Sequence, residues 1–161
     1  AGGCLSYLVG NIPEPEETVV DLDIFFYGCN EEQAIEKIRQ IAGSFPENSI
    51  LTFIRSKHAM TMVIDQTKIA DYHSDQPIHI QFIFRLYHSI SEILHGFDLG
   101  SSAVGYDGER LYFTANAKFA YEYQLNYIDN TRRSTTYEKR IAKYLTIFLF
   151  GLNFLGQAIA N

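Results

Sequence analysis

The sequence contains very little cysteine, and this scarcity narrows the kinds of site that it can build. Its 161 residues include only Cys4 and Cys29, and neither belongs to a CxxC pair or to a cluster of His and Cys. A disulfide scaffold and a structural zinc site are therefore not indicated, and a reducing compartment such as the cytoplasm is expected. The 5 histidines also lack HxxxH and HExxH spacing, which argues against a histidine-bound metal.

The sequence also lacks a visible signal peptide, an internal repeat and a low-complexity segment. Because it begins with Ala1, we expect a chain that is processed, trimmed or partly represented. The net charge of -6 argues against a protein that coats nucleic acid nonspecifically. Basic residues nevertheless gather after Thr131, where Glu138 is the only acidic residue; they are Arg132, Arg133, Lys139, Arg140 and Lys143. They would suit a phosphate-bearing ligand, a membrane surface or a partner, and a solvated helix face is the alternative.

Apolar residues are abundant, at 47% of the chain with 12 Phe and 11 Tyr, so a well-packed core is expected. Runs rich in Val, Ile and Phe predict strands at residues 18–28, 49–56, 58–65 and 77–87, and a hairpin at 101–114. Periodic apolar positions predict helices at 3–9, 30–42, 88–96, 117–126 and 136–155. The predicted fold class is α+β, a small mixed sheet with helices packed on one face. Residues 1–130 would form the core, and 131–161 a basic and then apolar helical segment.

Two aspartates one residue apart interrupt the apolar strand "TVVDLDIFFYG". Residues two apart in a strand share a face, so Asp21 and Asp23 project together while Leu22 and Ile24 pack on the other side. Two neighbouring carboxylates repel unless a cation lies between them, and Mg²⁺ bound to carboxylates and phosphates would remove that conflict. The alternative is a pair of acids on the solvated face of an edge strand.

Two glycines at the start of the chain strengthen the metal hypothesis. Gly2 and Gly3 precede a predicted short helix, and a glycine turn there would bring backbone N–H groups close to a phosphate. The stretch "AGGCLSYLVGNIPEPEETVVDLDIFF" resembles the nucleotidyltransferase fold of the DNA polymerase beta-like superfamily, in particular the head domains of tRNA nucleotidyltransferases and bacterial poly(A) polymerases. The resemblance implies that Gly2 and Gly3 bind the triphosphate and that Asp21 and Asp23 bind the catalytic metal.

A second stretch, "FDLGSSAVGYDG", is similar to a later motif of the same tRNA enzymes. Asp98 and Asp107 fall in comparable places, and Asp98 or Asp65 would supply a third metal ligand because the expected strand offers only Gln81. Ala103 and Tyr106 also match this later motif. The sequence departs from the family at two places: Ser6 and Tyr7 stand where an Arg-Asp pair is usual, and Ser102 stands where the motif has an Asn.

The resemblance implies a function: transfer of a nucleotidyl group from a nucleoside triphosphate to a hydroxyl or phosphate acceptor on RNA or protein, with Mg²⁺ or Mn²⁺. Arg132 and Arg133 would contact the phosphates. His79, beside Gln81, would be a general base or, more commonly, a structural histidine. The alternative function is a catalytically inactive protein of this fold with a structural or interaction role.

The C-terminal run "YLTIFLFGLNFLGQAIAN" has no charged residue. Its length is at the lower edge for crossing a bilayer, but Asn153 and Gln157 lower its hydrophobicity. We therefore expect a core helix or one that docks on a partner or another copy, with a tail anchor as the alternative. The stretches "HGFDLGSSAVGYDG" and "RRSTTYEKRIAKY" also resemble uncharacterised proteins of large DNA viruses, which makes a virion-associated protein a second expectation for its location.

Overall fold

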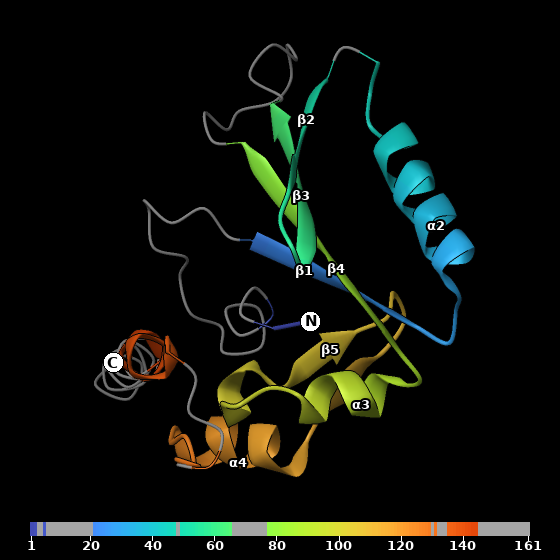
Figure 1. The fold of residues 1–161 in the computed structure, drawn as a ribbon. Helices are drawn as coiled ribbons and strands as arrows, with labels where there is room; N and C mark the ends of the chain where they lie inside the picture. Colours follow the sequence, from blue (N-terminus) through green and yellow to red (C-terminus); the bar gives the residue numbers. More distant parts are fainter. Residues whose placement is uncertain are drawn as a thin grey trace, which may run out of the picture. The chain divides into compact units, whose positions relative to one another are not determined.

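The chain forms two compact units. The computed structural model describes residues 1, 2, 5, 21–47, 49–65, 77–129, 131 and 135–144 (Figure 1). The first unit, which we call the hairpin unit, combines Ala1–Glu16 with Ile93–Asn161. The second, the sheet unit, comprises Glu17–Glu92. Leu5 is helical, and the rest of the predicted helix at residues 3–9 lies outside the described residues, as does most of the apolar C-terminal run.

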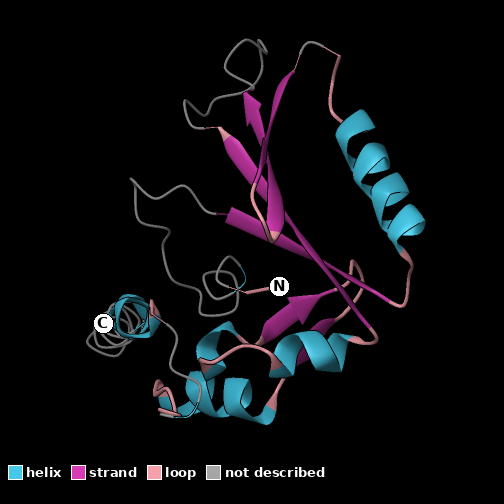
Figure 2. Ribbon diagram, viewed as in Figure 1, coloured by secondary structure: helices cyan, strands magenta, loops and turns pink. Residues whose placement is uncertain are grey.

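The sheet unit is built on four strands in the order β1-β4-β3-β2. They are β1 (Asp21–Tyr27), β2 (Ile50–Arg55), β3 (Ala59–Asp65) and β4 (Ile78–Tyr87). β1 pairs parallel with β4, and the β4–β3 and β3–β2 pairs are antiparallel, so the sheet is mixed (Figure 2). The four predicted strands of this unit are confirmed, with β1 described from Asp21 onward.

Helix α2 (Glu31–Gly43) covers one face of this sheet, as Figure 1 shows. Asn30 begins the helix with a capping box: its side chain accepts from the N–H of Gln33 at 2.9 Å, and the Gln33 side chain accepts from the N–H of Asn30 at 2.9 Å. Alternate strand residues point toward the helix and bury a single core, which contains Phe26, Ala34, Met62, Ile64, Ile80 and Phe82. This core fixes which strand residues face away from α2.

The hairpin unit contains a second, two-stranded sheet of β5 (Val104–Tyr106) and β6 (Leu111–Phe113). The predicted hairpin at residues 101–114 is confirmed, and its turn, residues 107–110, contains Asp107 and Gly108. The Asp107 carboxylate accepts from the backbone N–H groups of Arg110 and Glu109 at 2.8 and 2.9 Å and from the hydroxyl of Tyr112 at 2.8 Å. These bonds, led by that from Arg110, lower the pKa of Asp107 to about 2. Gly108 has a φ of 105°, which a residue with a side chain rarely adopts.

The 3₁₀ turn η1 (Gly100–Ser102) and helix α4 (Ala115–Tyr123) belong to the hairpin unit, whereas helix α3 (Ile90–His95) begins in the sheet unit and ends in the hairpin unit. α4 begins two residues earlier than predicted because Thr114 caps it, accepting from the N–H of Ala117 at 3.0 Å. It ends at Tyr123, before the predicted residue 126, because Gln124 turns into the left-handed region with a φ of 55°.

The inner side of α4 is made of small residues. Ala117 and Ala120 are fully buried, and the helix lies so close to η1 that a Cβ on Gly100 would be 2.6 Å from the backbone oxygen of Asn116. The hydroxyl of Tyr121 donates to the carbonyl of Ser101 at 2.7 Å and joins the two elements. α4 is thus fixed to η1 by close backbone contact and by a hydrogen bond.

Residues 137–144 are helical and belong to the hairpin unit. Tyr137 and Tyr144 are buried with Leu99, and Arg140 forms a hydrogen-bonded ion pair with the buried carboxylate of Asp98. The predicted α+β fold class is confirmed by the sheet with its helix and by the helices around the hairpin. The predicted division of the chain at residue 130 stays a prediction.

Candidate functional site

The two aspartates of the predicted metal site lie on the face of the sheet that points away from α2. The parallel register places Asp21 beside His79 and Asp23 beside Gln81 on β4. The Asp21 carboxylate is 3.4 Å from Nδ1 of His79, and the Asp21 side chain is 58% exposed. The predicted common face of Asp21 and Asp23, and the placing of His79 next to Gln81, are therefore confirmed.

Gly2 belongs to the hairpin unit, whereas the aspartates belong to the sheet unit. The N–H of Gly2 donates to the carbonyl of Val104 at 3.1 Å, and its φ is 94°. Gly3 lies outside the described residues. In the described part of the chain, no group of three or more His, Cys, Asp or Glu side chains could hold a metal ion. Binding of Mg²⁺ or Mn²⁺ by Asp21 and Asp23, and of phosphate by Gly2 and Gly3, stays a prediction.

Asp98, the third predicted ligand, belongs to the hairpin unit and is bonded to a guanidinium. Its carboxylate pairs with Arg140, and its side chain is only 9% exposed. A carboxylate held in this way already has the cation that a buried charge needs. Its role as a metal ligand stays a prediction. Arg132 and Arg133 lie outside the described residues.

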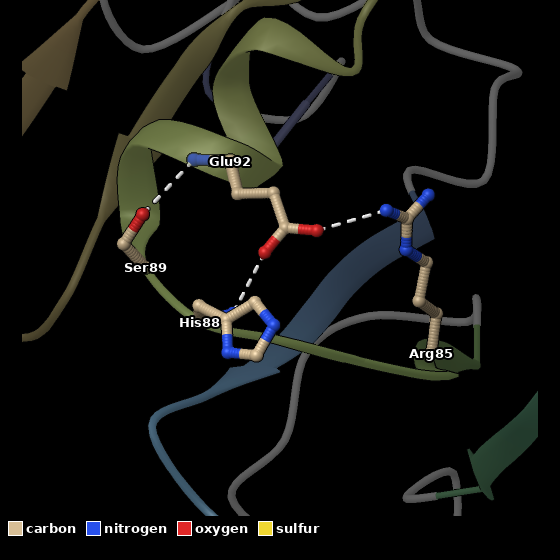
Figure 3. Close-up of polar contacts among 4 residues, drawn as sticks. All are labelled: Arg85, His88, Ser89 and Glu92. Carbon is tan, nitrogen blue, oxygen red and sulfur yellow. Dashed lines mark hydrogen bonds and ion pairs between the residues drawn. The ribbon is translucent and has the colours of Figure 1, made fainter.

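A polar cluster joins the end of β4 to the start of α3, and it contains no predicted site residue. The Glu92 carboxylate accepts from Arg85 Nη2 at 2.8 Å and from the backbone N–H of His88 at 2.7 Å (Figure 3). Ser89 Oγ accepts from the N–H of Glu92 at 3.2 Å, as a capping residue does. The His88 bond, helped by Arg85, lowers the pKa of Glu92. Since Arg85 also lies 4.7 Å from the ring centroid of Tyr87, the cluster fixes the local chain direction.

The hairpin unit exposes a run of large apolar side chains at the end of α4, which sequence reasoning missed. We call this set the α4 exit surface; it consists of Phe119, Tyr123, Leu125, Tyr127 and Ile128. Tyr127 is 71% exposed and Leu125 60% exposed. Phe119 and Tyr123, one helical turn apart, are in ring contact with centroids 4.8 Å apart and planes tilted by 36°. Glu122 is the only charged residue from position 119 to 128. This low charge among large apolar residues was the feature of the sequence that could have indicated the surface.

The segment that carries this surface is held in place by hydrogen bonds on both sides. The side-chain oxygen of Asn126 accepts from the N–H of Ser101 at 2.9 Å and ties the segment to η1. The N–H of Asp129 donates to the hydroxyl of the buried Tyr137 at 3.1 Å and ties its other end. Leu125 and Tyr127, which flank Asn126, are left exposed on a fixed backbone. Such an arrangement can bind a protein partner at a small entropic cost, because little ordering is left to do.

No helix in the described part of the chain is long and apolar enough to cross a membrane. The part of the C-terminal run for which a tail anchor was the alternative lies outside the described residues. Docking of that run on a partner or on another copy stays a prediction.

Comparison with known proteins identifies the family. A family model described as "Gabija anti-defense 2 family protein" matches residues 1–123, which include both sheets and α4. An uncharacterised protein of Acanthamoeba polyphaga mimivirus is 45% identical over 161 aligned residues, covering 89% of this chain and 33% of the mimivirus protein. The chain thus spans about a third of the length of this curated relative. No solved structure matches.

These findings correct the functional prediction. The assignment to the nucleotidyltransferases, the metal-dependent nucleotidyl transfer and the alternative of an inactive member of that fold are wrong, because the matching family is a different one. The prediction depended mainly on two short motifs, Gly2-Gly3 and Asp21-x-Asp23, and such motifs also arise as an ordinary turn and as the solvated side of a strand. The mimivirus relative is a viral protein, in line with the second resemblance. The chain belongs to the Gabija anti-defense 2 family.

Proposed function

We propose that this chain is part of a viral protein that counteracts the Gabija defence, and that it does so by binding a protein component of that defence through the α4 exit surface. Membership of the Gabija anti-defense 2 family supports the first part. This chain spans only about a third of the length of its mimivirus relative. The anti-defence activity is therefore proposed for the whole protein of which this chain is a part. The observation that carries the second part is the exposed aromatic segment fixed on both sides.

The composition of the α4 exit surface fits a binding role. Tyrosine is among the residues that contribute most to protein interfaces, because it brings a large rigid area and a hydroxyl at little entropic cost. Tyr123 is 58% and Tyr127 71% exposed, and Leu125 and Ile128 add aliphatic area beside them. Exposed apolar side chains scattered singly need no explanation, whereas a group on one short segment marks an interaction site. Phe119 and Tyr123 lie within the family match, and the other three residues follow it directly.

The binding can be tested with the chain and purified Gabija components. We expect the wild-type chain to co-purify with one component. Leu125→Ala combined with Tyr127→Ala should weaken that binding at least about tenfold, because each substitution removes apolar contact area from the interface. Leu111→Ala is the matched control, because Leu111 is a 51% exposed leucine of the same unit outside the surface. If the control weakens binding as much as the double variant, the surface is misassigned.

The anti-defence role has its own test in cells that carry Gabija and are infected by a virus that Gabija restricts. Expression of the chain within its full-length protein should raise the viral yield, and the double variant should lose that gain while Leu111→Ala keeps it. Unchanged yield with the wild-type protein would contradict the anti-defence role itself. Full rescue by the double variant would contradict only the role of the surface.

A further inference from the structure

We propose that a second copy of this chain pairs with the outer edge of β2, in an antiparallel arrangement centred on Thr52, so that two four-stranded sheets become one continuous sheet. This inference concerns the sheet unit and does not depend on the proposed anti-defence role. β2 is the last strand in the order β1-β4-β3-β2, and in the described part of the chain no strand pairs with its outer side. Such an edge offers a row of backbone N–H and C=O groups to another strand.

The sequence of β2 lacks the features that usually protect an edge strand. Natural edge strands carry charges, prolines or bulges, or are short. β2 reads ILTFIR, with no proline or glycine, with a charge only at its end, and with a regular six-residue ladder to β3. Its apolar side chains are also accessible, Ile50 at 43%, Phe53 at 48% and Ile54 at 58% exposure. An edge this long and apolar is suited to pairing with another strand.

The hydrogen bonds of the β2–β3 turn show which backbone groups are available. The N–H of Ser56 donates to the carbonyl of Ala59 at 2.8 Å, so this pair is hydrogen-bonded. Hydrogen-bonded pairs alternate along an antiparallel ladder, so Thr52 and Ile54 also bond toward β3. The N–H and C=O groups of Leu51 and Phe53 therefore point to the outer edge. His58, the residue before Ala59, bonds in the opposite direction, because its carbonyl accepts from the N–H of Phe84 in β4 at 2.9 Å. Successive residues here therefore bond alternately toward β2 and toward β4.

The register centred on Thr52 matches side chains of the same kind. When a two-fold axis perpendicular to the sheet relates the two copies, the α2 face of one copy continues into the α2 face of the other. Only residues of the same face can therefore lie opposite one another. In this register Leu51 lies opposite Phe53 of the second copy on the α2 side, and Ile50 lies opposite Ile54 on the other side. Thr52 meets its own counterpart. The neighbouring register, centred on Phe53, would instead place Leu51 opposite Arg55, a poorer cross-strand pair.

Charge favours a second copy as the occupant. Beyond its two ends β2 is flanked by Lys57 on one side and by Glu47 on the other, and both are exposed. In an antiparallel pair centred on Thr52, Lys57 of each copy comes to the end that carries Glu47 of the other. Like charges therefore stay at opposite ends of the pair, and each end carries a lysine of one copy and a glutamate of the other. A parallel pairing would place lysine beside lysine.

Cross-linking tests the register directly. Thr52 and its counterpart would form a non-hydrogen-bonded pair, with Cα atoms about 4.5 Å apart, within reach of a disulfide. We expect Thr52→Cys to give a covalent dimer under mild oxidation, with mass spectrometry identifying the bond between the two introduced cysteines and not one to Cys4 or Cys29. Phe53→Cys is the control, because diagonal residues lie about 7–8 Å apart and should not cross-link. Equal cross-linking of both variants, or none by Thr52→Cys, overturns the proposal.

Sedimentation equilibrium tests the association of the unmodified chain. We expect a reversible dimer, and Phe53→Pro should raise its dissociation constant at least about tenfold, because it removes an outward N–H while the bonds to β3 remain. Phe53→Ala keeps that N–H and should have a smaller effect. A wild-type chain that stays monomeric at millimolar concentration, or a proline variant that is folded and dimerises like wild type, overturns the proposal.

Discussion

Replacing Arg140 with alanine should destabilise the hairpin unit strongly, because it leaves a buried carboxylate without its cation. The Asp98 side chain is 9% exposed and that of Arg140 38% exposed, so the acid is the more deeply buried partner. Removing one member of a buried ion pair costs about 3–5 kcal/mol. Since Arg140 is partly accessible and water can enter in its place, we expect the free energy of unfolding to fall by about 3 kcal/mol, near the lower limit of that range.

The effect should be local, because Arg140 fastens a helical segment to the loop before η1. Tyr137 and Tyr144 lie one turn to either side of Arg140, and both are buried with Leu99. Hydrogen exchange should therefore accelerate at the backbone N–H of Ser102, which donates to the carbonyl of Leu99 at 3.2 Å. Urea unfolding followed by tyrosine fluorescence measures the total loss in the free energy of unfolding. Hydrogen exchange at individual amides shows which part of the unit is destabilised.

Two further variants decide whether the buried charge is the cause. Lys139→Ala removes an exposed cation from the neighbouring position and should change stability by less than about 0.5 kcal/mol. Asp98→Asn combined with Arg140→Met removes both charges and should restore most of the lost stability, because a neutral pair needs no cation. If Arg140→Ala lowers the free energy of unfolding no more than Lys139→Ala does, the ion pair contributes nothing to stability, contrary to the expectation.

Three other predictions follow from local contacts. Gly100→Ala places a Cβ 2.6 Å from the backbone oxygen of Asn116 and should lower the free energy of unfolding, measured by urea titration, by about 1–3 kcal/mol. Gly43→Ala is the control, because a Cβ at that position meets nothing within 4 Å. Asn30→Ala removes the cap of α2 and should cost about 1 kcal/mol; a loss smaller than that of an exposed mid-helix substitution would contradict it. The pKa of Asp107 falls from 3.8 to about 2 on folding, so its contribution to stability is complete above pH 4 and is lost as the pH falls toward 2. Asp107→Asn should therefore flatten the dependence of Tm on pH in that window, and an unchanged slope would exclude this carboxylate as its source.

The elements with a strong local signal could be predicted from the sequence. The capping box of Asn30 and Gln33 fixes the start of α2, and the alternation of Ile78, Ile80 and Phe82 fixes the buried side of β4. The Asp-Gly turn fixes the β5–β6 hairpin. In each case the information lies within a few neighbouring residues, so it is present before any tertiary contact forms.

Features that depend on distant contacts could not be predicted. Nothing near Asp98 in the sequence indicates that its partner is Arg140, 42 positions away. The segment after α4 shows no pattern of its own, and its conformation depends on Asn126 reaching Ser101 across 25 positions. The aspartates of β1 were placed correctly on one face, but their spacing is also that of any strand with a solvated side. Their position was therefore predictable, whereas the function attached to it was not.

The two proposed binding surfaces can be tested independently because they belong to different compact units. Tyr127 lies in the hairpin unit and Thr52 in the sheet unit, and each is exposed on the surface of its own unit. If self-association at β2 serves only to present two copies of the α4 exit surface, Phe53→Pro should weaken capture of a multivalent target and leave the affinity for a single site unchanged, since linked sites gain through effective concentration alone. If instead β2 itself contacts the Gabija component, Phe53→Pro should lower the affinity of a single site as well. Measuring single-site and multivalent binding with the same variant therefore separates dimerisation from direct recognition.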